Sequence, residues 1–412
     1  MNARFELQLD AMAHGGSAIG RHEGRAIFVP YAIPGERVRV EIAEDRGRFA
    51  TARLVEVLAP SPARVAPPCP YFGQGKCGGC QWQHIDYAVQ ARIKGLVVLD
   101  QFQRIGKFGS PPVLEPLPDS RGWEYRNHAL FRTDPDGHLG FLSSESHSVC
   151  PVTDCMIVHP LLSGLLNSLD MVYPDIEWLE MRAGTATGDL MLVLQTRDDE
   201  LPSLEVDFPV SIAQVLHDDA VVPLIGLDYI TESVRGREFR ISPTSFYQVN
   251  SMQAAQLVST VLEAVAPEPD EHILDAYCGV GLFAAFLSAE AGQVTGIELN
   301  PSAAHDAHHN LVGAENVRIL EGSVEAVLRE SSDTFDAAVI DPPRAGLELE
   351  ALDRLASCTP ARIVYVSCDP ATLARDCRRF ANHGYTLEWV QPIDLFPQTY
   401  HIEAVALLSK DE

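Results

Sequence analysis

The chain has 412 residues, of which 46% are hydrophobic and 21% are charged, so we expect a soluble globular protein with two or three domains. No apolar run is long enough to span a membrane, and residues 1–10 do not form a signal peptide, so a cytoplasmic protein is expected. The nine cysteines are an odd number, which argues against a disulfide framework and fits a reducing compartment.

The net charge of −26 is distributed unevenly along the chain. Residues 1–130 carry 16 Lys and Arg against 13 Asp and Glu, a balance of +3, whereas the remainder carries −29. A polyanion would be held at short range by the N-terminal third, and the acidic remainder would discourage loose binding. Solubility alone could produce the same asymmetry, so the charge pattern is compatible with a polyanionic partner without identifying one.

Residues 1–62 predict a small β-barrel. Glycine-containing turns separate four strand-like runs, which are Phe5–Leu9, Ala26–Val29, Arg37–Ile42 and Ala52–Val57. The pattern Gly20-Arg21-x-x-Gly24-x-x-x-Phe28-Val29-Pro30, followed by Pro34-Gly35-Glu36, resembles a TRAM domain, a small RNA-binding barrel of the oligonucleotide-binding (OB) type. Arg37 and Arg39 lie on one side of a predicted strand, where they could contact RNA or be solvated edge residues.

A proline-rich linker over 59–68 leads into a cluster of cysteines, Cys69-x7-Cys77-Gly-Gly-Cys80. Three thiolates within 12 residues, separated by glycines that allow a tight loop, predict a metal or iron–sulfur site. Zinc remains an alternative because it also accepts four cysteine ligands. A fourth ligand must come from elsewhere, and the spacing does not choose between Cys150 and Cys155.

The segment 271–298 has the pattern of a nucleotide-binding sheet: strand, glycine loop, helix and a second strand. Asp275 ends the first strand, Gly279 and Gly281 let the backbone approach a ligand, and Glu298 ends the second strand where it can bind ribose hydroxyls. The relaxed dinucleotide fingerprint also fits, so an NAD-linked oxidoreductase with an electron-transfer cluster is an alternative. Asp275 ahead of the glycines favours S-adenosylmethionine, as does Asp341, which ends a further strand.

Cys368 follows the apolar run Ile363–Val366, which predicts a buried strand. Ligands of open α/β sheets bind at the carboxyl ends of the strands, so a thiol in this position can be a nucleophile. The alternative is a buried structural cysteine. Glu403 precedes the apolar run Ala404–Leu408 and is either an acid near the same site or an ordinary surface carboxylate. Gln248 is either a ligand-binding residue or a polar helix cap.

Taken together, these motifs resemble those of the RNA uracil-5-methyltransferase family, which makes 5-methyluridine in ribosomal and transfer RNA. The resemblance runs nearly from end to end, and its motifs occur in the family's order. Besides the barrel and the cysteine cluster they are Ser242-Pro-Thr-Ser-Phe-Tyr-Gln248-Val-Asn250, Asp275-x-Tyr277-Cys-Gly-Val-Gly281, Asp341-Pro-Pro-Arg-Ala-Gly346, Val366-Ser-Cys368-Asp-Pro-Ala-Thr-Leu-Ala-Arg-Asp376 and Phe396-Pro-Gln-Thr-Tyr-His-Ile-Glu403.

The resemblance implies a role for each of these residues. S-adenosyl-L-methionine would contact Gln248, Tyr277, Glu298 and Asp341. Cys368 would be the catalytic nucleophile and Glu403 the base. A [4Fe-4S] cluster would be held by Cys69, Cys77, Cys80 and Cys155, the last preferred over Cys150 because the phrase around Asp154-Cys155-x-Ile157 matches the family's.

The chemistry explains why these residue types are needed. Uracil C5 is a poor nucleophile until a thiolate adds at C6, and a base must then remove the C5 proton so that the thiolate can leave. The target uracil must also leave its stack to reach the site. A non-catalytic RNA-binding protein on the same fold remains a third alternative, although the presence of both Cys368 and Glu403 argues against it.

The implied fold is α/β, with an N-terminal TRAM (OB-type) β-barrel over 1–62, a central α+β iron–sulfur domain over 63–240 and a Rossmann-like class I methyltransferase domain over 241–412. We expect a monomer that acts on 23S ribosomal RNA, with transfer RNA as the alternative. A helix containing Val89, Ile93, Leu96 and Val97 should leave the central domain and pack on the catalytic one.

The sequence departs from the family's pattern at three places. Asp369 stands where an asparagine is usual, and its charge beside the thiol should raise the pKa of Cys368. Leu282 stands where many relatives have Asn or Thr. The segment 160–240 matches only loosely.

Overall fold

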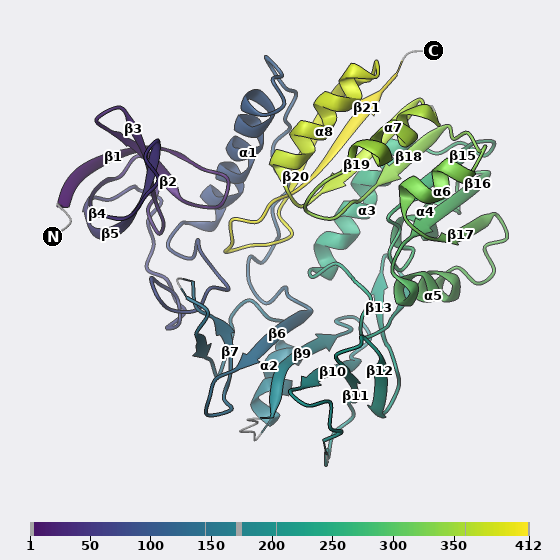
Figure 1. The fold of residues 1–412 in the computed structure, drawn as a ribbon, viewed down its shortest axis with the longest axis horizontal. Coiled ribbons are helices and arrows are strands. Elements are labelled where there is room, and N and C mark those ends of the chain that lie inside the picture. The colour runs from purple at the N-terminus through teal and green to yellow at the C-terminus, as the bar shows by residue number, and fades with distance from the viewer. Residues whose placement is uncertain (1–3, 145, 170–174, 203, 359, 411–412) are drawn as a thin grey trace.

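The computed structural model describes residues 4–144, 146–169, 175–202, 204–358 and 360–410 (Figure 1). It contains a closed barrel, a seven-stranded central sheet, a two-stranded hairpin and a seven-stranded C-terminal sheet. Within the described ranges, no helix is both long and apolar enough to cross a membrane.

The barrel predicted for the N-terminus is confirmed, with strands in the order β1-β2-β3-β5-β4. Its five strands are β1 Arg4–Met12, β2 Ala18–His22, β3 Arg25–Val29, β4 Arg37–Asp45 and β5 Phe49–Ala59. Alternate residues such as Leu7, Leu9, Val38 and Val40 point into a shared core, as the two-residue period of a strand requires. The sequence analysis missed the short strand β2.

A buried ion pair fixes the linker to the barrel. Glu36 is fully buried and accepts hydrogen bonds from Arg64 at 2.5 Å (Nε to Oε1) and 2.7 Å (Nη2 to Oε2). Burial raises the pKa of Glu36, but Arg64 and the backbone N–H groups of Ile33 and Ser61 outweigh it and hold the pKa below its usual value. Such a bidentate arginine–carboxylate pair has a fixed geometry, so the linker leaves the barrel in one direction.

The central sheet has the strand order β12-β11-β10-β9-β6-β7-β8. Its strands are β6 His128–Thr133, β7 Leu139–Leu142, β8 Val149–Pro151, β9 Ile176–Ala183, β10 Leu190–Thr196, β11 Ser211–Val215 and β12 Val221–Ile225. Helix α2, Pro160–Ser168, packs on β9 and buries Leu162 and Leu165 in the core of this sheet.

Helix α1, Tyr87–Arg104, begins just after the third cysteine and lies beside α8 of the C-terminal domain (Figure 1). Ile93, Val97 and Phe102 are buried in the core that α8 shares, which agrees with the helix expected there. Leu96 is 63% exposed, so its assignment to the packed face was wrong. The buried face instead continues from Val97 to Val98 and Phe102.

The C-terminal sheet has the order β17-β16-β15-β18-β19-β21-β20, with β21 antiparallel to both of its neighbours. Its strands are β15 His272–Ala276, β16 Gln293–Glu298, β17 Val317–Glu321, β18 Ala337–Ile340, β19 Arg362–Ser367, β20 Thr386–Ile393 and β21 Glu403–Ser409. The helices are α3 Ser251–Val265, α4 Leu282–Leu287, α5 Pro301–Asn310, α6 Val324–Glu330, α7 Leu349–Ser357 and α8 Pro370–Asn382. This is the Rossmann-like arrangement that the glycine loop predicted.

The hairpin formed by β13, Ile230–Val234, and β14, Arg237–Ile241, packs against α3 and α5. Ile230, Phe239 and Ile241 share the apolar core of the C-terminal sheet. The polypeptide therefore enters the C-terminal domain through a hairpin that already belongs to that domain's core.

Candidate functional site

Chain topology brings the predicted site residues to one edge of the C-terminal sheet. Glu298, Asp275, Asp341 and Cys368 lie at or just beyond the carboxyl ends of β16, β15, β18 and β19, which are neighbouring parallel strands. Glu403 begins β21, which runs in the opposite direction and therefore starts at this same edge. Ser367 pairs with Ala404, so Cys368 and Glu403 occupy the next positions on adjacent strands.

Cys368 lies in a desolvated and charged environment. Burial raises the pKa of its thiol, the Glu403 carboxylate raises it further, and the hydrogen bond and charge of Arg344 lower it, so the pKa lies at about 11. Glu403 is 3% exposed, and its pKa is raised well above the usual value by burial and by Asp341, with Arg344 acting in the opposite direction. Arg344 is therefore the cation shared by the thiol and Glu403.

His401 orients this arginine. The Arg344 guanidinium donates to His401 Nδ1 at 2.7 Å. Burial and the Arg344 charge lower the pKa of His401 to about 3, so the ring is neutral and can accept this hydrogen bond. Sequence analysis assigned no catalytic role to either residue, although both lie within motifs that also contain Asp341 and Glu403.

Asp369 does not act on the thiol as expected. Its Oδ1 accepts from the backbone N–H groups of Ala371 at 2.9 Å and Thr372 at 3.0 Å, so the residue is the N-cap of α8. Its Oδ2 lies 3.1 Å from Nε2 of His14 in the barrel. The raised pKa of Cys368 instead comes from burial and from Glu403, with a smaller contribution from Asp341.

Carboxylates that lack a protein cation surround the glycine loop. Asp275 Oδ2 accepts from the N–H of Ala284 at 2.7 Å, while its Oδ1 is buried and has no partner among the described residues. Burial raises the pKa of Asp275 to about 8 and that of Asp341 to about 7, where the Glu298 charge adds to the effect. Within the described chain, no lysine or arginine forms an ion pair with Asp275, Asp341 or Glu298. The group is suited to a ligand that brings hydroxyl donors and positive charge.

The backbone of the glycine loop has a conformation that lets a ligand approach it closely. Tyr277, Gly279 and Gly281 have φ values of 65°, 55° and 84°. The N–H of Gly279 donates to Glu298 Oε2 at 2.8 Å, which ties the loop to the end of β16. Tyr277 is not a glycine, so its left-handed backbone stores some strain at this position.

Gln248 lies in the segment between β14 and α3, and 8% of its surface is exposed. Its backbone carbonyl accepts from Asn127 Nδ2 at 2.8 Å. Asn250, and not Gln248, caps α3 by accepting from the N–H of Gln253 at 3.2 Å. The alternative of a helix cap is therefore wrong for Gln248.

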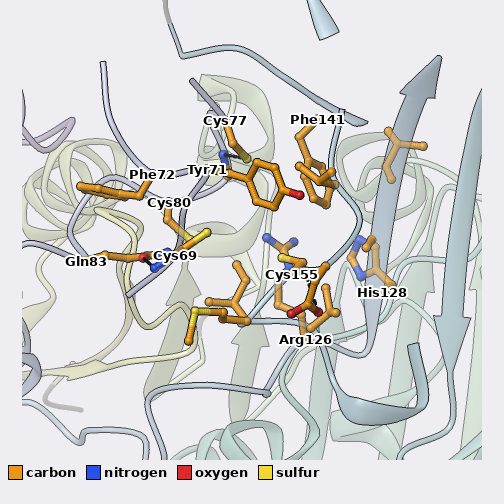
Figure 2. Close-up of a pocket in the computed structure, with 18 residues that line it drawn as sticks. Cys69, Tyr71, Phe72, Cys77, Cys80, Gln83, Arg126, His128, Phe141 and Cys155 are labelled. Atoms are coloured by element: carbon orange, nitrogen blue, oxygen red, sulfur yellow. Dashed lines mark hydrogen bonds between the residues drawn. The ribbon is translucent and has the colours of Figure 1, made fainter. Parts of the chain in front are cut away.

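The cysteine cluster lines a cavity of about 190 Å³ (Figure 2). Cys69, Cys77, Cys80 and Cys155 all contribute to its wall, and Figure 2 shows these four side chains gathered around one space. Cys150 lies on β8, opposite Phe141, and is not part of the wall. Burial raises the pKa of Cys77 to about 12 and also raises that of Cys80, and the neighbouring cysteines act in the same direction.

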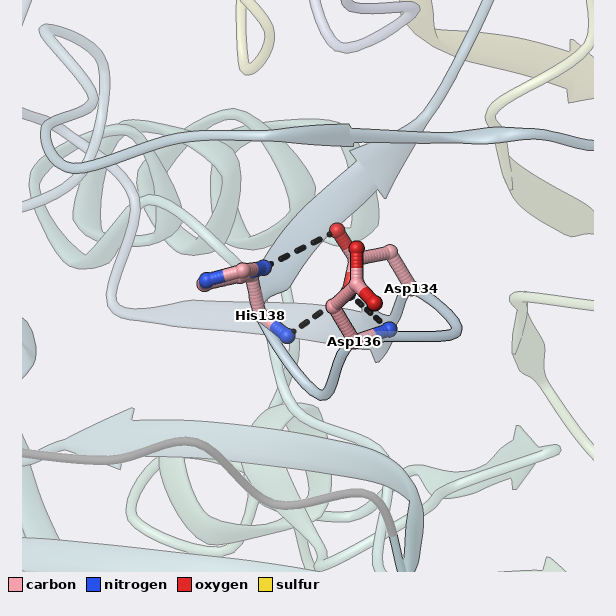
Figure 3. Close-up of side chains that lie close together, drawn as sticks. All are labelled: Asp134, Asp136 and His138. Carbon is pink, nitrogen blue, oxygen red and sulfur yellow. Dashed lines mark hydrogen bonds and ion pairs between the residues drawn. The ribbon is translucent and has the colours of Figure 1, made fainter.

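A second group of potential metal ligands, Asp134, Asp136 and His138, lies in the turn between β6 and β7 (Figure 3). Asp134 Oδ1 accepts from the N–H groups of Asp136 at 2.9 Å and His138 at 2.8 Å, and its Oδ2 lies 3.1 Å from His138 Nδ1. These contacts hold the turn together and account for the cluster without a bound cation.

The sequence is similar to those of known protein families and of individual relatives. The family described as tRNA (Uracil-5-)-methyltransferase matches residues 222–411, and the TRAM domain matches residues 4–55. An uncharacterized RNA methyltransferase of Streptomyces avermitilis is 39% identical over 99% of this chain and 98% of its own length. One of Halalkalibacterium halodurans, also uncharacterized, is 34% identical over 99% of this chain and 97% of its own length.

Among solved structures, the tRNA (uracil-54, C5)-methyltransferase of Pyrococcus abyssi, crystallised with S-adenosyl-L-homocysteine, superposes with a TM-score of 0.78. It is 26% identical, and the likeness covers 98% of this chain and 100% of that one. The barrel, the central sheet and the C-terminal sheet therefore form one architecture found in another protein, and the match is not limited to the common nucleotide-binding sheet.

The charges around Cys368 predict that two substitutions shift the pKa of its thiol in opposite directions. Arg344→Gln should raise the pKa of the thiol further above about 11, and Glu403→Gln should lower it, because the first removes a favourable cation and the second a repelling anion. At a fixed pH below both pKa values, iodoacetamide should therefore modify Cys368 more slowly in Arg344→Gln and faster in Glu403→Gln. Peptide mass spectrometry measures the two rates. Shifts of the same sign in both variants would contradict this electrostatic description.

Proposed function

This chain belongs to the RNA uracil-5-methyltransferase family and is an enzyme that transfers a methyl group from S-adenosylmethionine to uracil C5 in RNA; on that premise we propose that Cys368 and Glu403 carry the chemistry. The observation behind the proposal is their juxtaposition on adjacent strands beside Arg344. Because the chain matches this family, and matches an RNA methyltransferase over 99% of its length, the NAD-linked alternative is excluded.

In the proposed reaction the Cys368 thiolate adds to C6 of a uracil that has left its stack. The electron pair of the C5–C6 double bond moves so that C5 attacks the methyl group, and the sulfonium departs as a neutral thioether. Arg344 stabilises the thiolate before the addition, because its guanidinium hydrogen bonds the sulfur. Without that cation, the thiolate would face both Glu403 and Asp341.

Glu403 completes the cycle as the general base. After methyl transfer, C5 carries both the new methyl group and its original proton. The Glu403 carboxylate removes that proton, the C5–C6 double bond forms again and the Cys368 thiolate leaves. Burial and Asp341 raise the pKa of Glu403, so its carboxylate, once ionised, is a stronger base than an exposed glutamate.

We assign the methyl donor to the edge formed by Gln248, Tyr277, Glu298 and Asp341. Glu298 would receive the ribose hydroxyls, as an acid at the end of the second strand does in nucleotide-binding sheets. The unpaired carboxylates around the glycine loop fit a donor that carries a positive sulfonium and hydroxyl groups. Asp341 follows β18, the strand next to the one that Cys368 follows, so the methyl group would be presented towards the nucleophile.

We also propose that Cys69, Cys77, Cys80 and Cys155 hold a [4Fe-4S] cluster. The four thiols surround one cavity, whereas Cys150 lies outside its wall. A single zinc ion holds its sulfurs about 3.8 Å apart, since the Zn–S bond is about 2.3 Å in a tetrahedron. In the described residues, no three of these sulfurs lie within 4.8 Å of one another, so the thiols are not gathered as closely as one tetrahedral zinc ion would hold them.

For the substrate we propose 23S ribosomal RNA, with the barrel as an RNA-binding surface. Transfer RNA is the second candidate, favoured by the likeness to the Pyrococcus abyssi enzyme, whose name specifies uracil-54 of tRNA. The two candidates differ in which RNA carries the product, so a single mapping experiment separates them.

Deletion of the gene should remove 5-methyluridine from one position of 23S ribosomal RNA and leave transfer RNA unchanged. The wild-type gene should restore the modification and Cys368→Ala should not, because the alanine has no thiol to activate C5. Nucleoside mass spectrometry of separated RNA fractions measures this. Loss from transfer RNA would select the second candidate, and restoration by Cys368→Ala above one tenth of the wild-type level would refute the covalent mechanism.

Glu403→Gln should allow methyl transfer but slow the final elimination by about 100-fold or more, the usual contribution of a general base. The covalent RNA–protein adduct should accumulate and appear on a denaturing gel as a slow band that requires both RNA and S-adenosylmethionine. An inactive Glu403→Gln protein that binds both substrates and forms no adduct would assign the base to another residue.

Protein purified without oxygen should contain about four irons per chain. Cys155→Ser should lose most of this iron, because it removes a residue of the cavity wall. Cys150→Ser is the matched control: it changes a nearby cysteine outside the wall and should keep the iron. Metal analysis and the visible spectrum report both. Stoichiometric zinc would refute the cluster, and equal iron in both variants would refute Cys155 as a ligand.

A further inference from the structure

We propose that the turn between β1 and β2 of the barrel positions the catalytic site, because it contacts both the segment that carries Cys368 and the segment that carries Glu403. The inference rests on the proposed function, in which these two residues act together. Its positioning residues are His14 and Gly16, one for each segment.

His14 contacts the nucleophile's segment. Its Nε2 lies 3.1 Å from Oδ2 of Asp369, the residue that follows Cys368 and caps α8. Among the described residues, Nδ1 of His14 is buried without a hydrogen-bond partner, so the contact with Asp369 is the ring's one polar contact there. The same carboxylate thus fixes the start of α8 with one oxygen and binds the barrel with the other.

Gly16 contacts the base's segment. A Cβ at Gly16 would lie 2.6 Å from the Cβ of Tyr400, so only glycine allows the turn to pass this close. The carbonyl of Gly16 accepts from the indole Nε1 of Trp82 at 3.1 Å, and Trp82 is 1% exposed. The rings of Tyr400 and His401 lie with their centroids 4.4 Å apart and their planes tilted by 43°, and His401 accepts from Arg344.

The turn is held firmly enough to act in this way. Met12, at the end of β1, and Ile33 belong to the same apolar core as Trp82 and α8. The backbone N–H groups of Gln81 and Trp82 both donate to the carbonyl of Gln398, at 3.1 and 3.0 Å. The barrel turn, the segment before α1 and the segment before Glu403 therefore form one packed unit. Strand pairing already sets the spacing of Cys368 and Glu403, and the turn would hold the two segments that carry them in place.

Two variants with matched controls test the proposal in the full-length protein. His14→Ala removes the bond to Asp369, and His22→Ala changes a barrel histidine that stacks on Phe5 instead. Gly16→Ala introduces the clash with Tyr400. Gly24→Ala is its control, because Gly24 has a similar φ of +78° but no atom within 4 Å of an added Cβ.

The first readout is hydrogen exchange of the peptides over 366–373 and 398–403. His14→Ala should increase exchange in the first peptide and Gly16→Ala in the second, whereas both controls should match the wild type. This arm needs no RNA. It therefore tests the coupling even if the wild-type protein methylates no uracil, an outcome that would refute the proposed function alone.

The second readout is the single-turnover methylation rate at saturating RNA and S-adenosylmethionine. His14→Ala and Gly16→Ala should each lower it by about tenfold, the scale of one charge-assisted hydrogen bond, with the RNA KM changed less than twofold. His14→Gln, which keeps an N–H donor, should recover most of the rate. In a double-mutant cycle, His14→Ala should have little further effect in a background of Asp369→Asn.

Two results would overturn the proposal. In the first, the hydrogen exchange and the methylation rate of His14→Ala and Gly16→Ala equal those of their controls, His22→Ala and Gly24→Ala. In the second, the variants raise the KM for RNA and leave the single-turnover rate unchanged, which would mean that the turn binds RNA and does not position the catalytic residues.

Discussion

Negative charge held away from water is the constraint on which this site depends. Asp275 and Glu403 are buried, and Asp341 lies between them in the strand order. Burial raises the pKa of each, and the neighbouring carboxylates raise it further. Such a group is costly unless a ligand or a cation offsets it. Arg344 offsets it on the side of the thiol, and the proposed methyl donor would offset it on the side of the glycine loop.

The segment that carries Glu403 depends in turn on the central part of the chain. Lys94 of α1 is fully buried and donates to Asp394 at 2.6 Å and to the carbonyl of Phe396 at 3.0 Å. Gln90, one turn earlier, donates to the side chain of Gln398 at 2.9 Å. Because α1 begins directly after the cysteine loop, the proposed cluster would anchor the helix that holds the catalytic segment. The proposed cluster would then have a structural role.

Much of the site was predictable because its residues follow strands with a clear apolar pattern. Asp275, Glu298 and Cys368 each end such a run, and parallel strands bring their ends to one edge. The antiparallel strand β21, which brings Glu403 to the same edge, has no local signal of its direction. The strands over 176–225 were not assigned, because the sequence analysis found only a loose match there. Leu96 was misplaced because the buried face of α1 turns towards α8 and the barrel, contacts that lie far away in the sequence.

Asp369 and the arginines of α8 show why a charge cannot be interpreted from sequence position alone. Asp369 follows the thiol in sequence, yet its oxygens face α8 and His14. Arg375 and Arg379 both pair with the buried Asp376, and Arg378 donates to the carbonyls of Gly106 and Lys107. These side chains are engaged within the fold, which leaves fewer cations of the acidic domain available for phosphates. The N-terminal third has a balance of +3, although its arginines also form ion pairs, such as Arg25 with Asp45 and Arg39 with Glu56. Since the barrel in that third also contacts both catalytic segments, RNA held there would be held by the element that positions Cys368 and Glu403.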